Sequence, residues 1–354
     1  MKLLVLPRYG RLGASSRLRS YQYLPWFQEA GIDVHVHALL DDHYLQALYS
    51  KRRAPLAVLR GYIGRTRWLL AARHFDAIFV EKEAYPWVFS FIELGMLSRH
   101  VRIVVDYDDA VFHNYDRHPN SLVRKLLGTK LDRLMARAAM VTVGNNYLAD
   151  RAISAGAHRV ERIPTVVDLD RYLQLPRGEM AEEIVIGWIG SPSTAHYLQQ
   201  VNGSLTDLCK RFRLRCVAIG ARPDQLQGTP FTAAEWGEDT EVASLRGMDI
   251  GIMPLPDAPW ERGKCGYKLI QYMACGLPVV ASPVGVNKEI VDDGENGFLA
   301  DSPEAWTRSL ERLITDAGLR AQMGASGRKK VEADYCLQVQ GPRLAGMLID
   351  LGKT

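Results

Sequence analysis

The sequence is poor in cysteine and has no long hydrophobic run. Its five cysteines show neither CxxC spacing nor an accompanying set of histidine ligands, which argues against a zinc site or a disulfide framework and favours a reducing compartment. No apolar stretch approaches the roughly 20 residues that span a bilayer. The apolar run near the start is too short for a signal peptide. These absences predict a soluble, cytoplasmic protein.

An excess of one charge is also lacking. The 44 basic and 40 acidic side chains give a net charge of only +4, which argues against a dedicated nucleic-acid binder. No GxGxxG motif follows the first expected strand, so a dinucleotide-dependent dehydrogenase is not indicated. What is present is 354 residues with 47% hydrophobic side chains. That length and composition predict two folded domains rather than a disordered chain.

Short β-rich runs alternate with helical patterns along the whole chain. The expected strands are residues 3–6, 34–38, 77–80, 103–105, 141–143, 159–164, 184–189, 216–219, 250–253 and 278–281. Helical spacing marks 122–135 and, at the end of the chain, 337–351. Such alternation implies parallel sheets with right-handed crossovers. Two series separated by a break near 164–183 predict an α/β protein with two doubly wound domains.

A glycine-rich segment of the second series is a candidate phosphate site. Residues 262–268, RGKCGYK, place two glycines and three cations directly before a helix that ends at Gly276. A helix N-terminus presents N–H groups and partial positive charge to an anion. Arg262, Lys264 and Lys268 would neutralise a diphosphate there, and the alternative is a solvated basic turn.

A second glycine turn, residues 187–194 (GWIGSPST), favours the phosphate interpretation. It closes the first strand of this series, and such strand ends line the ligand crevice of open α/β sheets. We expect Trp188 to belong to the core. Ser191 is either a helix cap or a donor to phosphate oxygens.

Residues 248–300 carry a family resemblance, above all in YMACGLPVV (272–280) and GENGFL (294–299). This run resembles the donor-binding half of retaining glycosyltransferases of the GT-B type, family 4 (group 1). The resemblance implies two facing Rossmann-like domains with an interdomain cleft and a C-terminal helix that returns to the N-terminal domain. It divides the chain into an acceptor-binding domain (1–168), a donor-binding domain (169–335) and a final helix (336–354).

The resemblance also implies the donor site. A nucleoside-diphosphate sugar would bind the second domain, and no metal or other cofactor is expected because helix dipoles and basic side chains replace it. The donor-binding residues expected are Gly190, Ser191, Trp236, Arg262, Gly263, Lys264, Cys265, Gly266, Tyr267, Lys268 and Gln271, with Lys264 and Lys268 also catalytic. The family's paired glutamates fall on Gly263 and Gln271. Gln271 can still bind ribose hydroxyls, whereas Gly263 cannot contact the sugar.

The first domain offers the acceptor site. The glycine-rich loop after the first strand and the acidic run at the end of the strand 103–105 supply the acceptor-binding candidates Gly13, Ser15, Arg17, Asp106, Asp108 and Asp109. Crowded carboxylates at a strand end indicate a ligand or a cation. Asp108 is the catalytic candidate, through a hydrogen bond to an acceptor hydroxyl. Helix capping by Ser15, loop capping by Asp106 and metal binding by a DxD-like pair are the alternatives.

Residues 51–73 contain seven lysines and arginines and no acid between apolar side chains. Such a helix suits an anionic membrane surface; the alternative is an ordinary amphipathic helix with a solvated basic face.

The activity indicated is a retaining transfer of a sugar to a glycan or lipid-linked acceptor, in bacterial-type cell-surface polysaccharide or glycoconjugate assembly. The location expected is the cytoplasm, or peripherally the inner face of the plasma membrane. The alternatives are a nucleotide-sugar epimerase or hydrolase using Glu235, Glu238 and Glu241 near Trp236, and a catalytically silent nucleotide-sugar-binding subunit.

Overall fold

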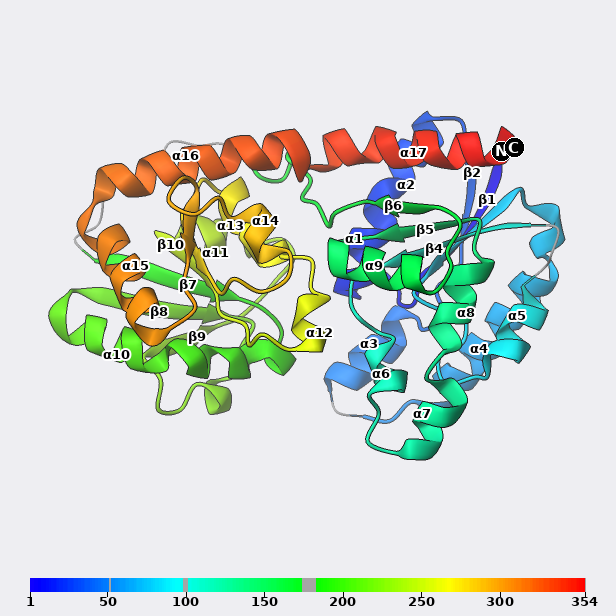
Figure 1. Ribbon diagram of the computed structural model, residues 1–354, viewed down its shortest axis with the longest axis horizontal. Coiled ribbons are helices and arrows are strands. Elements are labelled where there is room, and N and C mark those ends of the chain that lie inside the picture. The colour runs from blue at the N-terminus through cyan, green and yellow to red at the C-terminus, as the bar shows by residue number, and fades with distance from the viewer. Residues whose placement is uncertain (51, 98–100, 174–182, 354) are drawn as a thin grey trace. The chain divides into compact units, whose positions relative to one another are not determined.

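A computed structural model describes residues 1–50, 52–97, 101–173 and 183–353. The chain forms two compact units (Figure 1). Unit 1 comprises Met1–Thr165, Arg262–Cys265 and Leu337–Thr354, and unit 2 comprises Val166–Glu261 and Gly266–Cys336. The sequence placed the first boundary after residue 168 and assigned 262–265 to the second domain.

Unit 1 is built on a parallel sheet of six strands in the order β2-β1-β3-β4-β5-β6. Its strands are β1 (Lys2–Leu6), β2 (Asp33–Val36), β3 (Ala77–Glu81), β4 (Arg102–Tyr107), β5 (Met140–Val143) and β6 (Val160–Arg162). Its helices are α1 (Ala14–Arg19), η1 (Tyr21–Tyr23), α2 (Leu24–Glu29), α3 (Asp42–Tyr49), α4 (Pro55–Leu70), η2 (Ala72–His74), α5 (Ser90–Met96), α6 (His113–Asp116), α7 (Ser121–Leu127), α8 (Lys130–Arg137), α9 (Asn146–Ser154) and α17 (Leu337–Lys353).

Unit 2 repeats this architecture, with a parallel sheet in the order β12-β11-β10-β7-β8-β9. Its strands are β7 (Ile184–Ile189), β8 (Leu214–Ile219), β9 (Phe231–Ala234), β10 (Ile250–Met253), β11 (Val279–Ala281) and β12 (Gly297–Leu299). Its helices are η3 (Pro192–Val201), α10 (Asn202–Arg211), η4 (Pro223–Gln225), α11 (Glu241–Arg246), α12 (Pro259–Arg262), α13 (Tyr267–Ala274), α14 (Asn287–Ile290), α15 (Pro303–Thr315) and α16 (Ala317–Asp334).

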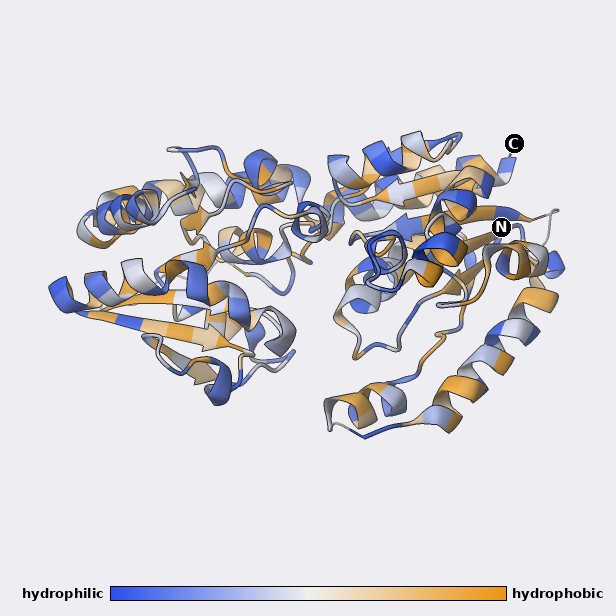
Figure 2. Cartoon of the chain, turned by 60° about the horizontal axis from the view of Figure 1, so that its bottom comes forward, coloured by the Kyte–Doolittle hydropathy of each residue, from blue (hydrophilic) through white to orange (hydrophobic). Residues whose placement is uncertain are grey.

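The predicted α/β fold with two parallel sheets is confirmed. Central strands such as β3 and β10 are buried at every residue, because helices cover both faces of a parallel sheet. In Figure 2, orange marks hydrophobic residues along strands of both units. The edge strands β9 and β12 were not predicted. β9 has four residues, of which the adjacent Thr232 and Ala233 are exposed, and β12 has three residues, so neither leaves a periodic hydrophobic signal. The single helix expected over 122–135 is two helices, α7 and α8.

The C-terminal helix α17 belongs to unit 1, as the resemblance implied. It packs on α2, and a Cβ on Gly341 would lie 2.6 Å from the ring of Trp26. Glycine at this position therefore allows the two helices to approach closely.

Candidate functional site

In unit 2, the turn after β7 lies against the first turn of α13. A Cβ on Gly190 would lie 2.4 Å from the ring of Trp188 and 2.9 Å from Cε of Lys268, so only glycine fits. The Lys268 ammonium lies 5.4 Å from the Trp188 ring centroid, within cation–π range. Trp188 is 1% exposed, which confirms its predicted place in the core. The structure thus brings together Gly190 and Lys268, two residues that the sequence assigned to the donor.

The N-terminus of α13 begins at Gly266, which has a φ of +65°. This left-handed conformation favours glycine, and a Cβ would also lie 2.3 Å from Cδ1 of Ile290. No side chain caps the helix. A helix start without a side-chain cap, with a lysine in its first turn, has the geometry and charge that an anionic group requires.

Trp236 and Gln271 are joined by a chain of hydrogen bonds. Gln271 Nε2 donates to the Tyr172 hydroxyl at 3.1 Å, and that hydroxyl donates to Glu241 Oε1 at 3.1 Å. Trp236 Nε1 donates to Glu241 Oε2 at 2.7 Å, and Trp236 Cβ lies 3.5 Å from the Cβ position of Gly220, at the end of β8. Gln271 is buried and its amide nitrogen is used internally, which differs from the expected role on ribose hydroxyls. Instead, it helps to orient Trp236.

The glycine-rich segment expected to act as one phosphate loop is divided between the units. In unit 1, Asn145 Nδ2 donates to the Lys264 carbonyl at 2.9 Å, and the Cys265 thiol donates to the Asp108 carbonyl at 3.0 Å. Burial raises the pKa of the Cys265 thiol. Because this side chain is turned into unit 1, the structure does not support its prediction as a donor ligand. Only Gly266–Lys268 of the segment lies with unit 2.

Gly263 stands where the family carries a glutamate. A Cβ there would lie 2.5 Å from Cβ and 2.7 Å from the backbone nitrogen of Ala110, so no side chain fits. The nearby Glu261 does not take its place, because it is buried and accepts a hydrogen bond from Tyr197 at 2.5 Å. Ser191 precedes η3 without capping it, and its hydroxyl lies 2.8 Å from that of Ser193.

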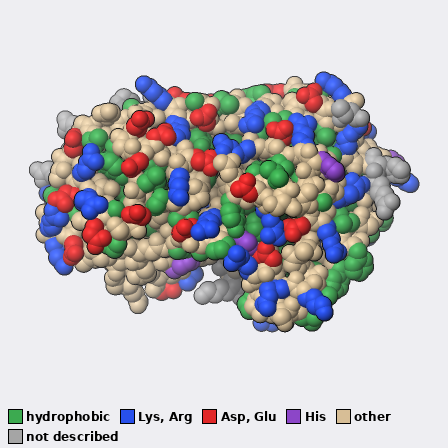
Figure 3. Space-filling model, viewed as in Figure 1, with side chains coloured by type: hydrophobic (Ala, Val, Ile, Leu, Met, Phe, Trp, Pro, Cys, Tyr) green, Lys and Arg blue, Asp and Glu red, His purple; other side chains and the backbone are tan. Residues whose placement is uncertain are grey.

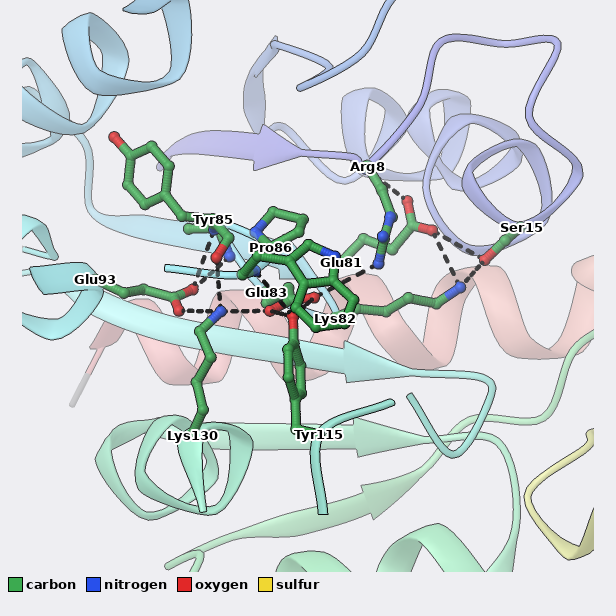
Figure 4. A network of polar contacts seen from close by, with 12 residues as sticks. Arg8, Ser15, Glu81, Lys82, Glu83, Tyr85, Pro86, Glu93, Tyr115 and Lys130 are labelled. Atoms are coloured by element: carbon green, nitrogen blue, oxygen red, sulfur yellow. Dashed lines mark hydrogen bonds and ion pairs between the residues drawn. The ribbon is translucent and has the colours of Figure 1, made fainter. Parts of the chain in front are cut away.

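In unit 1, a polar cluster lies where β3 and β4 end (Figure 4). Lys82 Nζ donates to Ser15 Oγ at 2.8 Å and lies 3.0 Å from Asp108 Oδ1. The Ser15 hydroxyl lies 2.7 Å from Asp108 Oδ2 and 2.9 Å from Glu81 Oε1. Lys82 has a φ of +64°, a strained conformation for a residue other than glycine. Carboxyl ends of parallel strands are where open α/β sheets bind ligands.

Electrostatics keep both members of the Lys82–Asp108 pair charged. Burial raises the pKa of Asp108, but the charges of Lys82 and Arg19 outweigh it, and the net pKa is lowered. Burial lowers the pKa of Lys82, but the charges of Asp108 and Glu81 outweigh this effect, and the net pKa is raised. Asp108 is therefore an ionised hydrogen-bond acceptor at neutral pH.

Asp106 was predicted to bind the acceptor, and the structure gives it another role. It is 1% exposed, and Arg19 donates to both of its oxygens, at 2.6 and 2.9 Å. Thr142 Oγ1 donates to Asp106 Oδ1 at 2.6 Å. A buried carboxylate with these partners holds β4, β5 and α1 together rather than meeting a ligand, and it caps no loop.

The remaining acceptor candidates lie around α1 and after β4. Gly13, not Ser15, is the N-cap of α1, so the interpretation of Ser15 as a cap is wrong. Arg17 is buried, with Nη1 directed to the Arg11 carbonyl at 3.5 Å. Asp109 is half-buried beside Asp108. Of these, Ser15 makes direct contacts with Lys82 and Asp108, and the charge of Asp109 also raises the pKa of Lys82.

Glu81, Lys82 and Glu83 were missed by the sequence analysis. Glu83 accepts hydrogen bonds from Tyr115 and Lys130, and Arg8 lies 3.5 Å from it (Figure 4). The signal was available, because three charged residues follow the strand 77–80 just as the acidic run follows 103–105. The two runs lie at the same edge of one parallel sheet.

Helix α4, within the basic stretch, presents its apolar side chains outward. Leu56, Leu59, Ile63 and Leu70 are all exposed, Leu56 by 68%. Arg65 is fully buried and donates to the carbonyls of Pro7 and His37 at 2.6 and 3.3 Å. Leu69 is also buried, so α4 packs on unit 1 through Leu69 and Arg65 while these four apolar side chains stay exposed. Lys51, at the start of the stretch, lies outside the described residues.

Among the residues that the structure describes, no group of three or more His, Cys, Asp or Glu side chains is arranged to hold a metal ion. None of the helices described is both long and apolar enough to cross a bilayer.

Solved structures of one fold match nearly the whole chain. HepE from Anabaena, in complex with UDP, matches with a TM-score of 0.74 over 99% of this chain and 100% of that one, at 16% identity. Sucrose-phosphate synthase from Thermosynechococcus elongatus matches with a TM-score of 0.75 over 99% of each chain, at 13% identity. At these identities the likeness establishes the fold, and that fold is GT-B.

Sequence comparisons match part of the chain to glycosyltransferases. Residues 184–316 match the family described as Glycosyl transferases group 1. The GDP-mannose-dependent alpha-(1-6)-phosphatidylinositol monomannoside mannosyltransferase of Mycolicibacterium smegmatis is 27% identical over 246 residues, 62% of this chain and 64% of that protein. The D-inositol 3-phosphate glycosyltransferase of Salinispora tropica is 42% identical over 101 residues, 28% of this chain and 20% of that protein. The matches thus span less than two thirds of these relatives. Residues 184–316 thus resemble group 1 glycosyltransferases in sequence, on a chain with the GT-B fold.

Proposed function

We propose that the protein transfers a sugar from a nucleoside-diphosphate sugar to a hydroxyl acceptor with retention of configuration, as a family 4 enzyme. The observation that carries the donor assignment is the N-terminus of α13, which has no side-chain cap and has Lys268 beside Gly190. A diphosphate there would meet backbone N–H groups and an ammonium. The names of related proteins support this ligand class, since HepE structures hold UDP and UDP-glucose and one relative is GDP-mannose-dependent.

The acceptor would bind unit 1 through Asp108. Its carboxylate is ionised and held by Lys82 and Ser15, and the side chain keeps an exposure of 11%, through which it can accept a hydrogen bond from a sugar hydroxyl. Glu81 and Asp106, in contrast, are buried among protein partners. Asp108 would orient the acceptor, and no protein nucleophile is required.

The proposed step exchanges one bond for another at the anomeric carbon. The acceptor oxygen forms the new glycosidic bond on the face from which the diphosphate leaves, and the bond from that carbon to the phosphate oxygen breaks. The acceptor proton passes to the departing diphosphate oxygen, so atoms and charge balance. The N-terminus of α13 and Lys268 would stabilise the negative charge that develops on the leaving group. We place Lys264 second to Lys268, because its backbone is held in unit 1.

Calorimetry with UDP-glucose and GDP-mannose tests the donor site. Lys268→Ala should weaken binding of whichever nucleotide sugar the wild type prefers by at least about tenfold, since one charge-assisted contact contributes about 1.5–3 kcal/mol. Lys210→Ala is the matched control, because Lys210 is an exposed lysine in a surface ion pair with Asp207. Unchanged affinity in Lys268→Ala would remove the diphosphate from this position.

We also propose that α4 docks unit 1 on the cytoplasmic face of an anionic membrane, where a lipid-linked acceptor of cell-surface glycoconjugate assembly would lie. Its outward apolar side chains are flanked by Arg60 and Arg67, which are exposed. Hydrophobic side chains gather over this part of unit 1 in Figure 3. An apolar stripe between cations is complementary to acyl chains beneath anionic head groups.

Sedimentation with phosphatidylglycerol-containing vesicles tests the docking. Leu59→Ser/Ile63→Ser should abolish cosedimentation, and high salt should weaken it in the wild type. Leu173→Ser, at an exposed leucine of unit 2, is the control and should bind as the wild type does. Equal binding by the α4 variant and the control would refute the assignment.

A further inference from the structure

A hollow of about 880 Å³ opens in unit 1 between α3 and the first half of α4. Its wall includes Arg52, Arg53 and Arg60, together with His43, Leu56 and one carboxylate, Asp41. The volume lies within the range of small-molecule sites, about 300–1,000 Å³, and greatly exceeds that of a single phosphate. The lining thus combines cationic and apolar side chains.

The walls of the hollow are held by close packing. A Cβ on Gly61 would lie 2.0 Å from the Leu39 carbonyl oxygen, so only glycine lets α4 approach the chain after β2 this closely. Arg65, on the next turn of α4, donates to the His37 carbonyl at 3.3 Å. These contacts fix the inner side of α4, which forms one wall of the hollow.

The charge on the wall lacks an internal counterpart. Among the residues that the structure describes, Arg52, Arg53 and Arg60 have no carboxylate partner, although all three are exposed at the hollow. Asp41 already accepts a hydrogen bond from the Tyr44 backbone at the start of α3. Three guanidinium groups around one opening match the bidentate acceptor geometry of a phosphate.

Leu56 connects the hollow with the outward apolar stripe of α4. It lines the hollow and is also the first member of that stripe, which continues through Leu59 and Ile63. An occupant whose phosphate meets the arginines can therefore lay an apolar tail along α4 without leaving the protein surface. Neither a free phosphate nor an uncharged lipid would use both features.

We propose that this hollow binds the phosphate-bearing end of an amphiphilic lipid. The inference rests on the proposed transferase function, because it assigns the acceptor to the phosphate-bearing lipids and gives unit 1 a site for the acceptor's phosphate apart from Asp108. The arginines bind the phosphate, and Leu56 and its neighbours on α4 contact the tail.

Titration with dihexanoyl phosphatidic acid below its micelle concentration tests the proposal. Arg53→Gln/Arg60→Gln should weaken binding by at least about tenfold, since two charge-assisted contacts are removed. The control Arg73→Gln/Arg117→Gln removes the same charge from exposed arginines outside α4 that do not line the hollow, and it should change affinity by less than about threefold. Equal weakening in both pairs would overturn the proposal, because it would show diffuse attraction only.

Two further ligands separate the possible sources of the anion. Inorganic phosphate should bind much more weakly than the lipid, and dihexanoyl phosphatidylcholine should bind weakly because its head group has no net charge. Inorganic phosphate binding as tightly as the lipid would contradict the amphiphile.

Nucleotide-sugar titrations of the same variants distinguish this inference from the proposed function. The pair in the hollow should lose the lipid and keep the nucleotide sugar, and Lys268→Ala should do the reverse. Loss of the nucleotide sugar in Lys268→Ala, with lipid binding intact in Arg53→Gln/Arg60→Gln, would reject the hollow and leave the transferase standing. The opposite pattern would reject the donor site alone.

Discussion

The two units have sheets of the same topology but different chemistry where their strands end. In unit 1, β3 and β4 end in charged side chains that are buried and paired, such as Glu81, Lys82 and Asp108. In unit 2, β7 and β8 end in Gly190 and Gly220, where a side chain would collide with its neighbours. Glycines at the strand ends of unit 2 leave room and backbone groups for a ligand that brings its own charge, such as a diphosphate. The charged side chains at the strand ends of unit 1 suit a neutral ligand that presents hydroxyl groups.

Removing the buried cation from the charged strand ends of unit 1 should have the largest effect of the changes considered. Lys82→Met would leave Asp108 and Glu81 without their buried cation, which should lower the free energy of unfolding by about 3–5 kcal/mol. Urea denaturation measures this, with Lys210→Met as an exposed control that should change stability by less than about 0.5 kcal/mol. A loss below about 1 kcal/mol would mean that the pair does not organise this edge.

The pH dependence of Lys82→Met sharpens the same comparison. The folded pKa of Asp108 lies below its unfolded value, so its contribution to stability is present above the unfolded pKa of about 3.8 and is lost as the pH falls through the folded pKa. Removing Lys82 should raise the folded pKa and reduce this acid-dependent contribution. Urea denaturation at a series of pH values down to about 3 measures this contribution. The same loss of stability with falling pH in Lys82→Met and in the wild type would contradict the assignment.

Substituting a glycine at the strand ends of unit 2 should remove donor binding. Gly190→Ala places a Cβ against the Trp188 ring, and we expect at least about a hundredfold loss of nucleotide-sugar affinity as the turn moves away from α13. Calorimetry measures the loss and circular dichroism confirms the fold. Gly203→Ala in α10, where a Cβ meets nothing within 4 Å, should bind the donor normally and be slightly more stable.

The smallest change expected is in the orientation of the acceptor. Asp108→Asn keeps the shape but loses the carboxylate charge, so kcat should fall by about tenfold while donor affinity stays within about twofold. Steady-state kinetics with calorimetry separate the two. Equal activity would dismiss Asp108, and equal losses of kcat and donor affinity would assign it to general folding instead.

Local patterns explain how much of the fold could be predicted. Ile184–Ile189 and Ile250–Met253 have the predicted bounds because central parallel strands are continuous apolar runs. The short edge strand Gly297–Leu299 lacks such a run and was missed.

Site positions could be predicted where neighbouring residues define them. They could not be predicted where they depend on contacts between residues far apart in the sequence. Gly190 and Lys268 follow from a strand end and a helix start, which neighbouring residues define. The roles of Asp106 and Gly263 depend on Arg19 and Ala110, far away in the sequence, and no local spacing reveals those contacts. The outward face of α4 was missed for the same reason, because its neighbours bury Arg65 and leave Leu56 and Leu59 exposed.

A crystal structure with a bound nucleotide sugar tests the central claim most directly. We predict that the diphosphate will lie at the N-terminus of α13, hydrogen-bonded to backbone N–H groups of its first turn and within reach of Lys268 Nζ. A diphosphate bound elsewhere on the chain, with that helix start and lysine not in contact with it, would contradict the account.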